Sequence, residues 1–343
     1  MDDATSLAQI HEPAAADPSS AADRIGAVVI GRNEGARLEA CLASLRGRVE
    51  RMVYVDSGST DGSVAAARRS GAEVVELDRD QPFTAARARN AGLDAFAEGA
   101  RPEYTQFVDG DCTVDAAWIE VATRFLDAHP RAAVVCGRRR ERFPEVSVYN
   151  RLCDWEWDTP IGPAKACGGD ALTRTAAVIA IGGYRPALIA GEEPELCLRL
   201  RRAGWEIWRI DAEMTAHDAA IHRFAQWWRR CRRAGYAFAE GAWLHGGAPE
   251  RHWVAETRRA LAWAILPGAV AVALAPLGGA ALLVLSVYPL QVARLAARQG
   301  GVGRRASWER ALFTVLAKFP EATGVAEFRR MRLRGGRTLI EYK

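Results

Sequence analysis

The chain has 343 residues, of which 49% are hydrophobic and 26% charged, a composition that excludes a fibrous or wholly disordered protein. The net charge of +4 hides an asymmetry: residues 1–221 carry 26 Lys/Arg against 35 Asp/Glu, a net of −9, and residues 222–343 carry 20 against 7, a net of +13. The seven cysteines form no CxxC pair, which argues against a disulfide framework or a zinc site and fits a reducing cytosol.

The N-terminal half of the chain predicts an α/β domain. Residues 1–24, rich in Ala, Asp, Pro and Ser, are expected to be a disordered lead-in without a signal sequence. The expected strands are 25–30, 51–56, 72–77 and 104–109. The expected helices lie at about 38–45, 63–70, 84–99 and 115–127. This alternation predicts a mainly parallel sheet flanked by helices, with ligands at the carboxyl ends of the strands.

The next segment is less regular. A long strand with a basic end is expected over 132–143, and a helix is expected over 146–158. A further helix is expected over 192–204, followed by a last strand over 205–210. The segments between them carry turn signals such as "CGGD" and "IGGY".

Residues 260–297 are apolar and contain one charge, Arg294. The turn signal "APLGGA" divides them into two pieces of about 16 residues, whereas a full membrane span needs roughly 20. Two interpretations remain, a helical hairpin that dips into or crosses a bilayer and a hairpin buried in a soluble domain. Arginines at both ends favour the membrane and place both ends on its cytoplasmic side.

The segments on either side of the apolar residues mix aromatic and basic side chains, as in "QWWRRCRR" and "SWERALF". We expect helices at the level of the lipid headgroups, the alternative being surface helices packed on the preceding domain. A basic region of this kind suits anionic membrane lipids. No nucleic-acid recognition motif occurs, so nucleic acid is not an expected partner.

The stretch "FVDGDC" places Asp109 and Asp111 directly after an expected strand. Read as an EF-hand calcium loop, it supplies oxygens from Asp109, Asp111, Thr113, Asp115 and Glu120. However, Val114 stands where that loop needs glycine, and a strand precedes it where an EF-hand needs a helix. Two further interpretations are a pair of capping aspartates and a divalent-metal site. The first strand lacks GxGxxG, which disfavours a dinucleotide-binding site.

Six motifs in one order resemble the family 2 glycosyltransferases, which have the GT-A fold. They are "VVIGRNEGARLEACLASL", "VYVDSGSTDGS", "RARNAGLDAF", "FVDGDC", "CGGDALTR" with "IGGYRP", and "GEEPELCLRLRRAGW". The resemblance runs from about Ile25 to Tyr236 and implies a GT-A catalytic domain over 25–220. It leaves interfacial helices over 221–258, the apolar hairpin over 259–299 and a basic amphipathic segment over 300–343.

The resemblance also implies roles for individual residues. The donor nucleotide would be bound by Gly31, Arg32, Glu34, Asp56, Ser57, Arg89 and Asp109. A Mg²⁺ or Mn²⁺ ion would be held by Asp109, Asp111 and His217. Glu193 lies where the family usually has an aspartate as the general base, which leaves the choice between Glu193 and Glu192 open. Acceptor contacts would come from Gly169, Asp170, Arg229 and Arg230.

These residues fit one chemistry. A metal ion neutralises the diphosphate leaving group of a nucleotide sugar, and a carboxylate removes the acceptor proton. The expected function is therefore inverting transfer from a UDP-, GDP- or dTDP-sugar to a glycan or lipid-linked acceptor, at the cytoplasmic face of the inner membrane. The alternatives are a nucleotidyltransferase-like enzyme and a catalytically silent membrane scaffold.

Overall fold

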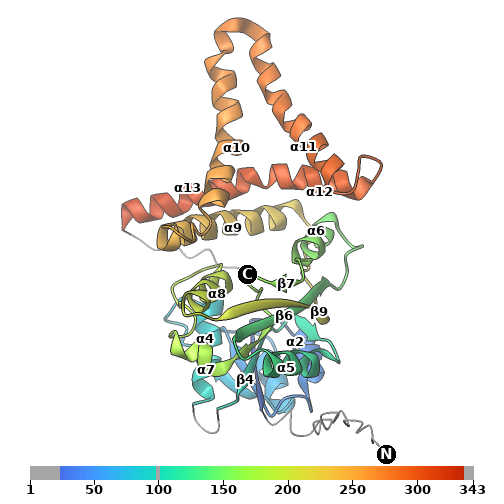
Figure 1. The fold of residues 1–343 in the computed structure, drawn as a ribbon, viewed down its shortest axis with the longest axis vertical. Helices are drawn as coiled ribbons and strands as arrows, with labels where there is room; N and C mark the ends of the chain where they lie inside the picture. Colours follow the sequence, from blue (N-terminus) through green and yellow to red (C-terminus); the bar gives the residue numbers. More distant parts are fainter. Residues whose placement is uncertain (1–23, 98–100, 336–343) are drawn as a thin grey trace, which may run out of the picture.

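The computed structural model describes residues 24–97 and 101–335. The lead-in predicted for residues 1–24 lies outside these ranges except for Arg24. Within them the chain forms a sheet domain, a layer of helices and a projecting hairpin (Figure 1).

The first four strands are parallel in the order β3-β2-β1-β4. They are β1 (Ile25–Gly31), β2 (Arg51–Asp56), β3 (Glu73–Glu76) and β4 (Tyr104–Asp109). The helices that follow β1, β2 and β3 are α2 (Ala36–Leu45), α3 (Ser63–Arg69) and α4 (Ala85–Ala95). Helix α2 buries Leu38, Cys41, Leu42 and Leu45, an apolar stripe with helical spacing. The predicted parallel half of the sheet is confirmed.

The remaining strands make the other half of the sheet mixed. They are β5 (Cys112–Val114), β6 (Ala132–Glu141), β7 (Gly162–Pro163), β8 (Ala171–Arg174) and β9 (Glu206–His217). Strand β8 runs antiparallel to both β4 and β6, while β6 and β9 are parallel. Strand β9 continues past the predicted end at 210 because its last residues pair with both β5 and β6. The helices of this half are α5 (Trp118–Ala128), α6 (Val148–Trp157), α7 (Thr175–Ala180) and α8 (Glu192–Arg202).

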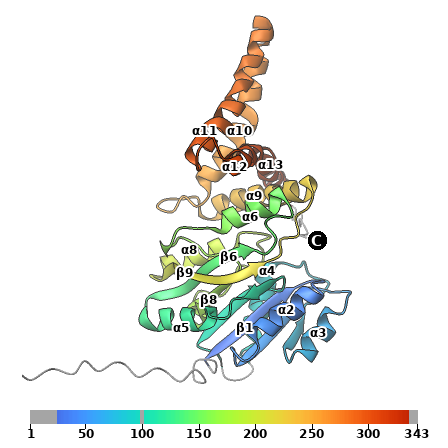
Figure 2. The same ribbon diagram turned by 90° about the vertical axis from the view of Figure 1, so that its right-hand side faces the viewer.

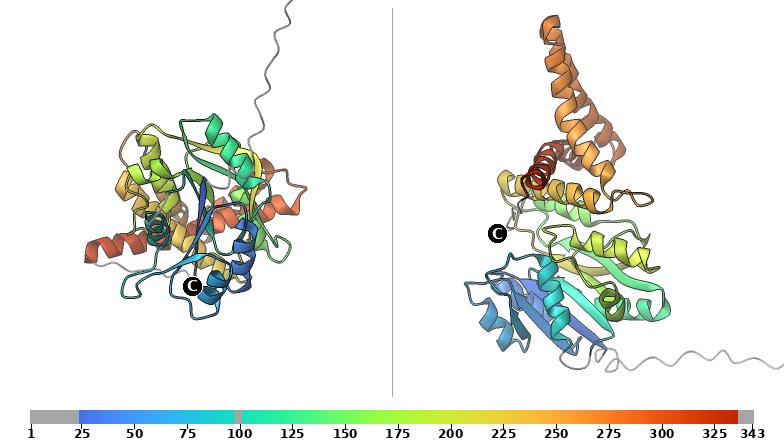
Figure 3. Two further views of the ribbon diagram at one scale, coloured as in Figure 1. Left: turned by 90° about the horizontal axis from the view of Figure 1, so that it is seen from below. Right: turned by 90° about the vertical axis from the view of Figure 1, so that its left-hand side faces the viewer.

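The C-terminal part of the described chain is helical. Its elements are α9 (Phe224–His245), α10 (Val254–Ala273), the 3₁₀ helix η1 (Ala275–Ser286), α11 (Val287–Arg298), α12 (Arg305–Leu316) and α13 (Lys318–Arg334). Helices α9, α12 and α13, here called the helical layer, lie between the sheet domain and the hairpin of α10, η1 and α11 (Figures 1 and 2). The right-hand view of Figure 3 shows the same three levels from the side opposite to Figure 2.

Two glycines allow α9 and α13 to cross in close contact. A Cβ atom on Gly235 would lie 2.0 Å from the carbonyl oxygen of Glu321, and one on Gly324 would lie 2.0 Å from that of Arg232. Real side chains do not approach backbone this closely, so both positions require glycine in this arrangement. The helical layer is therefore joined by backbone contact as well as by its side chains.

The hairpin exposes its apolar side chains. Val272, Leu277 and Leu283 are each at least 70% exposed. Within the described ranges, one helix, Ala275–Arg298, is long and apolar enough to cross a membrane, with a mean hydropathy of 1.6. Only 11% of its apolar window is buried, so most of this apolar surface is not covered by other described residues of the chain.

Candidate active site

A cavity of about 350 Å³ opens at the carboxyl ends of β1 and β4, where the strand pattern predicts ligand binding. Most of the predicted site residues line it: Gly31, Arg32, Glu34, Ser57, Arg89, Asp109, Asp111, Gly169, Glu192, Glu193, His217 and Arg230. Three predicted residues do not line it: Asp56, Asp170 and Arg229. Residues from α6 and α9 close the cavity on the side of the helical layer.

Asp109 ends β4 and lies between two arginines. Its Oδ1 is 2.9 Å from Nη2 of Arg89, and its Oδ2 is 3.2 Å from Nη2 of Arg139. The fully buried Asp170 accepts a hydrogen bond from the Asp109 backbone N–H at 3.2 Å and pairs with Arg139 at 3.4 Å. Asp170 therefore fixes the strand end and Arg139 from behind the cavity wall.

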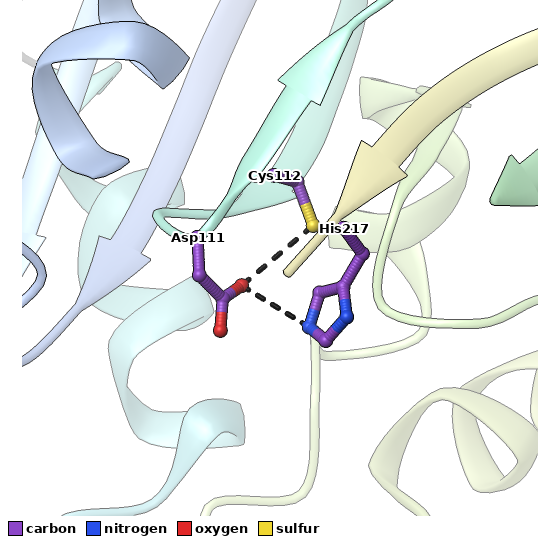
Figure 4. A group of neighbouring side chains, drawn as sticks. All are labelled: Asp111, Cys112 and His217. Atoms are coloured by element: carbon purple, nitrogen blue, oxygen red, sulfur yellow. Dashed lines mark hydrogen bonds and ion pairs between the residues drawn. The ribbon is translucent and has the colours of Figure 1, made fainter. Parts of the chain in front are cut away.

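Strand pairing brings Asp111 and His217 together. In the β5–β9 ladder Cys112 faces His217, and in the β6–β9 ladder Glu141 faces His217. His217 Nε2 consequently lies 3.3 Å from Oδ1 of Asp111 (Figure 4). On the other side of the ring, Nδ1 lies 3.9 Å from Oε2 of Glu141. Burial and Arg139 act in the opposite direction, but the carboxylates of Asp111 and Glu141 raise the pKa of His217 above its ordinary value.

The donor atoms around Asp111 fit a divalent metal ion. One imidazole nitrogen and one carboxylate oxygen converge, and a second carboxylate lies behind the imidazole, as is common for metal-bound histidines. Cys112 contributes the third atom of this group, with Sγ 3.7 Å from Oδ1 of Asp111. Burial raises the pKa of the Cys112 thiol well above its ordinary value, so it remains protonated and is a poor ligand. Oxygen and nitrogen donors of this kind suit Mn²⁺, and oxygen alone suits Mg²⁺.

Arg89 joins the strand ends to helix α8. Its side chain is 2% exposed, and Nη1 lies 3.0 Å from Oε1 of Glu192 and 2.8 Å from Oε1 of Glu193. Gly191 precedes the helix with a left-handed φ of 80°, and a Cβ there would lie 2.4 Å from the Trp253 ring. This cap fixes where the two glutamates enter the cavity.

The pKa of Glu193 is raised into the neutral range. Burial first, and then the neighbouring charge of Glu192, raise its pKa from 4.5 to about 7, and Arg89 only partly offsets them. Both glutamates line the cavity, and the Glu193 side chain is 13% exposed against 6% for Glu192. A carboxylate with this pKa can accept a proton near neutral pH.

The backbone of Gly169 lies close to the charged groups of the site. A Cβ there would be 2.7 Å from Nη2 of Arg89 and 2.9 Å from Oδ2 of Asp109. The backbone at residue 169 therefore approaches the charged groups more closely than any side chain allows. Its predicted acceptor contact stays a prediction.

Asp56 and Arg229 lie away from the cavity surface. Asp56 is 2% exposed and accepts hydrogen bonds from the Tyr54 hydroxyl and from the backbone N–H groups of Gly58 and Ser59. It therefore orders the turn that carries Ser57, and its predicted contact with the base stays a prediction. Arg229 is exposed on α9, while Arg230 lines the cavity and makes a two-pronged ion pair with Glu156.

Arg139 is the main site residue that the sequence did not reveal. It touches Asp109, Asp170 and the Sγ of Cys112, and its guanidinium lies 4.8 Å from the Trp157 ring centroid. The feature of the sequence that could have indicated Arg139 is the basic end predicted for the strand over 132–143. Alternation along β6 separates the three arginines there: Arg138 pairs with Asp154 and Arg140 with Glu213, while Arg139 faces the cavity.

Comparison with known proteins bears on this site. Residues 27–166 match the family described as "Glycosyl transferase family 2". Among curated proteins, the succinoglycan biosynthesis protein ExoA of Rhizobium meliloti (strain 1021) is 27% identical over 198 residues, 52% of this chain and 58% of that protein. The pre-mycofactocin glycosyltransferase of Mycobacterium tuberculosis (strain CDC 1551 / Oshkosh) is 28% identical over 219 residues, 59% of this chain and 44% of that protein. The chain thus spans about half the length of these relatives.

Among solved structures, the chain is similar to the mannosyltransferase PcManGT from Pyrobaculum calidifontis, determined in complex with GDP-Man and Mn²⁺. The TM-score is 0.62 at 20% identity, and the superposition covers 92% of this chain and 90% of that one. The likeness at this identity is one of fold, and it extends over the helical C-terminal region as well as the sheet. The chain is therefore similar to glycosyltransferase family 2 over residues 27–166, and its fold is GT-A.

Proposed function

We propose that the chain transfers a sugar from a nucleotide diphosphate donor to an acceptor hydroxyl with inversion at the anomeric carbon. The observation that carries this proposal is the position of Glu193 in the same cavity as Asp109, Asp111 and His217. A cavity with a base of pKa about 7 beside a carboxylate–imidazole metal site contains both groups that single displacement needs.

In the proposed reaction, Glu193 accepts the proton of the acceptor hydroxyl as its oxygen bonds to the sugar C1. The bond between C1 and the diphosphate oxygen breaks, and the nucleoside diphosphate leaves with that electron pair. An α-linked donor therefore gives a β-linked product. Asp111 and His217, with Asp109 beside them, would hold Mg²⁺ or Mn²⁺, which when bound supplies charge neutralisation at the diphosphate.

Arg89 and Arg139 supply positive charge beside Asp109. In this structure both guanidinium groups contact Asp109, and both line the cavity. We propose that they bind donor oxygens alongside Asp109. Gly31, Arg32, Glu34 and Ser57 line the same cavity at the ends of β1 and β2, and we assign the nucleoside to them, with UDP, GDP or dTDP as the carrier.

The acceptor is proposed to enter from the helical layer. That side of the cavity is lined by Cys153 and Trp157 of α6, Arg230 and Arg233 of α9, and the apolar Ile189 and Ile221. Apolar and cationic side chains together suit an acceptor with a lipid and a charged group. We therefore favour a lipid-linked acceptor over a soluble glycan, used at the cytoplasmic face of the membrane in which the hairpin is embedded.

A donor screen tests the proposal. The purified chain is incubated with UDP-, GDP- and dTDP-sugars, with and without Mn²⁺, while thermal stability and released nucleoside diphosphate are measured. We expect one nucleotide class to stabilise the protein only when Mn²⁺ is present, and Asp111→Asn to abolish that dependence. No metal-dependent stabilisation by any donor would overturn the proposal and leave the silent scaffold. Release of sugar 1-phosphate in place of nucleoside diphosphate, with the nucleoside monophosphate passed to an acceptor, would indicate a nucleotidyltransferase.

A further inference from the structure

The tip of the hairpin has no polar side chain. Between Trp263 and Ser286 the sequence contains no charged or hydrogen-bonding side chain. Leu277, Leu282 and Leu283 at the tip are 70%, 66% and 72% exposed. A hairpin that spans a bilayer ends in the far headgroup region, where polar residues and interfacial aromatics are favoured. This tip has neither.

The backbone of the tip is bonded to itself. The N–H of Leu274 donates to the carbonyl of Val270, and that of Leu277 donates to the carbonyl of Leu274. Pro276 has no N–H to satisfy, and the segment Ala275–Ser286 consists of two 3₁₀-helical pieces that meet at a kink at Gly278. Backbone groups must find partners within the chain when no water is available. Such bonds within the turn are needed in hydrocarbon, whereas in water the solvent could take their place.

Aromatic and basic residues mark the level at which the hairpin enters the membrane. The Tyr288 hydroxyl donates to the Trp263 carbonyl at 2.8 Å, and the Tyr288 ring lies 5.6 Å from the Phe319 ring of α13. Tyrosine and tryptophan favour the membrane interface, so this pair defines the level of the headgroups. Below it, exposed arginines surround the base of the hairpin: Arg258, Arg294, Arg298 and Arg304. Their charge complements anionic lipid headgroups.

The length of the hairpin sets how far it penetrates. From Trp263 to Leu277 the helix rises about 21 Å at roughly 1.5 Å per residue. The hydrocarbon core is about 30 Å thick. The tip therefore passes the middle of the bilayer and ends short of the opposite headgroups.

We infer that α10, η1 and α11 form a re-entrant anchor that enters the bilayer from the side of the catalytic domain and turns back inside the hydrocarbon core. This inference rests on the membrane attachment in the proposed function and specifies its topology. The occupant of the exposed apolar surface is the acyl-chain region of a bilayer with anionic headgroups. The chain then has no residue of the hairpin on the far side of the membrane.

Cysteine labelling at two exposed positions tests this topology. Ala280→Cys places a thiol at the tip, and Val302→Cys places a matched thiol at the base, between α11 and α12. The native cysteines are buried or half-buried, and the parent protein measures their background. Each variant is produced in membrane vesicles of both orientations and treated with a membrane-impermeant maleimide. We expect Val302→Cys to react from the cytoplasmic side only and Ala280→Cys to react from neither side until detergent is added.

Each other outcome overturns the inference. Reaction of Ala280→Cys from the far side would show that the hairpin spans the bilayer. Reaction from the cytoplasmic side would place the hairpin in water. A tip thiol carrying a fluorophore should also be quenched by phosphatidylglycerol and phosphatidylcholine brominated on their acyl chains, and absence of quenching would indicate a second protein chain around the tip. These readouts are independent of turnover, so loss of sugar transfer and loss of this topology are distinguishable.

Discussion

The sheet domain and the helical part of this chain place charged and apolar side chains in opposite ways. In the sheet domain charged groups are buried and neutralised in a network, with Arg89 and Arg139 each contacting two or more carboxylates. In the hairpin the apolar groups are exposed, and the layer beneath it is joined through glycines. We expect the function of the sheet domain to depend on the charge of its buried side chains. We expect the stability of the helical part to depend on the size of its side chains. Substitutions that change one property at a time separate the two.

Glu193→Gln changes charge and almost no volume in the sheet domain. We expect the turnover to fall by about 10²–10⁴-fold because the base is lost, while the donor dissociation constant stays unchanged. The pKa of Glu193 is raised by folding, so the native carboxylate costs stability above about pH 7, and the variant should be no less stable at pH 8. Glu192→Gln is the matched control. If Glu192→Gln loses turnover and Glu193→Gln keeps it, the assignment of the base is wrong.

Glu141→Gln changes one charge behind the proposed metal site. Glu141 lies 3.9 Å from Nδ1 of His217, on the side away from Asp111. Removing a carboxylate behind a metal-bound histidine weakens metal affinity by about 10–100-fold. We therefore expect a higher Mn²⁺ concentration for half-maximal activity, with full activity recovered at saturating Mn²⁺. An unchanged Mn²⁺ requirement would argue against His217 as a ligand.

The pH dependence of wild-type turnover should follow the protonation of Glu193. In the proposed mechanism Glu193 must be deprotonated to act, and its pKa is about 7. Turnover should therefore fall tenfold per pH unit below about pH 7 and level off above it. Between about pH 4.5 and 7 turnover should rise with pH, whereas the free energy of unfolding should fall. The unfolded chain loses the Glu193 proton at a lower pH than the folded chain does, so raising the pH over this range favours the unfolded state. A rate profile that is flat down to pH 5 would contradict the assigned pKa.

Gly324→Ala changes volume and no charge in the helical layer. The added methyl group would meet the Arg232 carbonyl and the Tyr236 backbone nitrogen, so α9 and α13 must move apart. We expect a loss of about 1–3 kcal/mol in the free energy of unfolding, as for overpacked cores. Gly268→Ala in α10 is the control, since nothing lies within 4 Å of its Cβ position. Equal denaturation midpoints for the two variants would refute the close crossing.

The parallel half of the sheet could be predicted nearly residue by residue, because each strand is a short apolar run followed by a helix with a single buried stripe. Strands 51–56 and 104–109 agree with β2 and β4 at both ends. Strands β5 and β8 were not predicted, because three- and four-residue strands have too little periodicity to detect. The mixed order of the second half depends on them, since β8 separates β4 from β6.

The same limit applies to the site. Asp109 and Asp111 could be predicted from their place at the end of β4, but no sequence pattern indicated a role for Arg139. Its partners Asp109 and Asp170 are 30 and 31 residues away along the chain, and they meet it only through the pairing of β4, β8 and β6. The glycine crossing of α9 and α13 was likewise invisible, because a glycine in a helix shows its purpose only when its neighbour is in place.

Helix α9 contacts both regions, and it therefore sets the distance between the cavity and the hairpin. One part of it supplies Arg230 and Arg233 to the cavity wall, and Gly235 touches the backbone of α13. The reaction centre is thus held at a fixed height above the bilayer that we infer for the hairpin. Acceptors would then be selected by reach: a hydroxyl carried too close to the lipid surface, or too far above it, would not meet Glu193 however well the rest of the molecule fits.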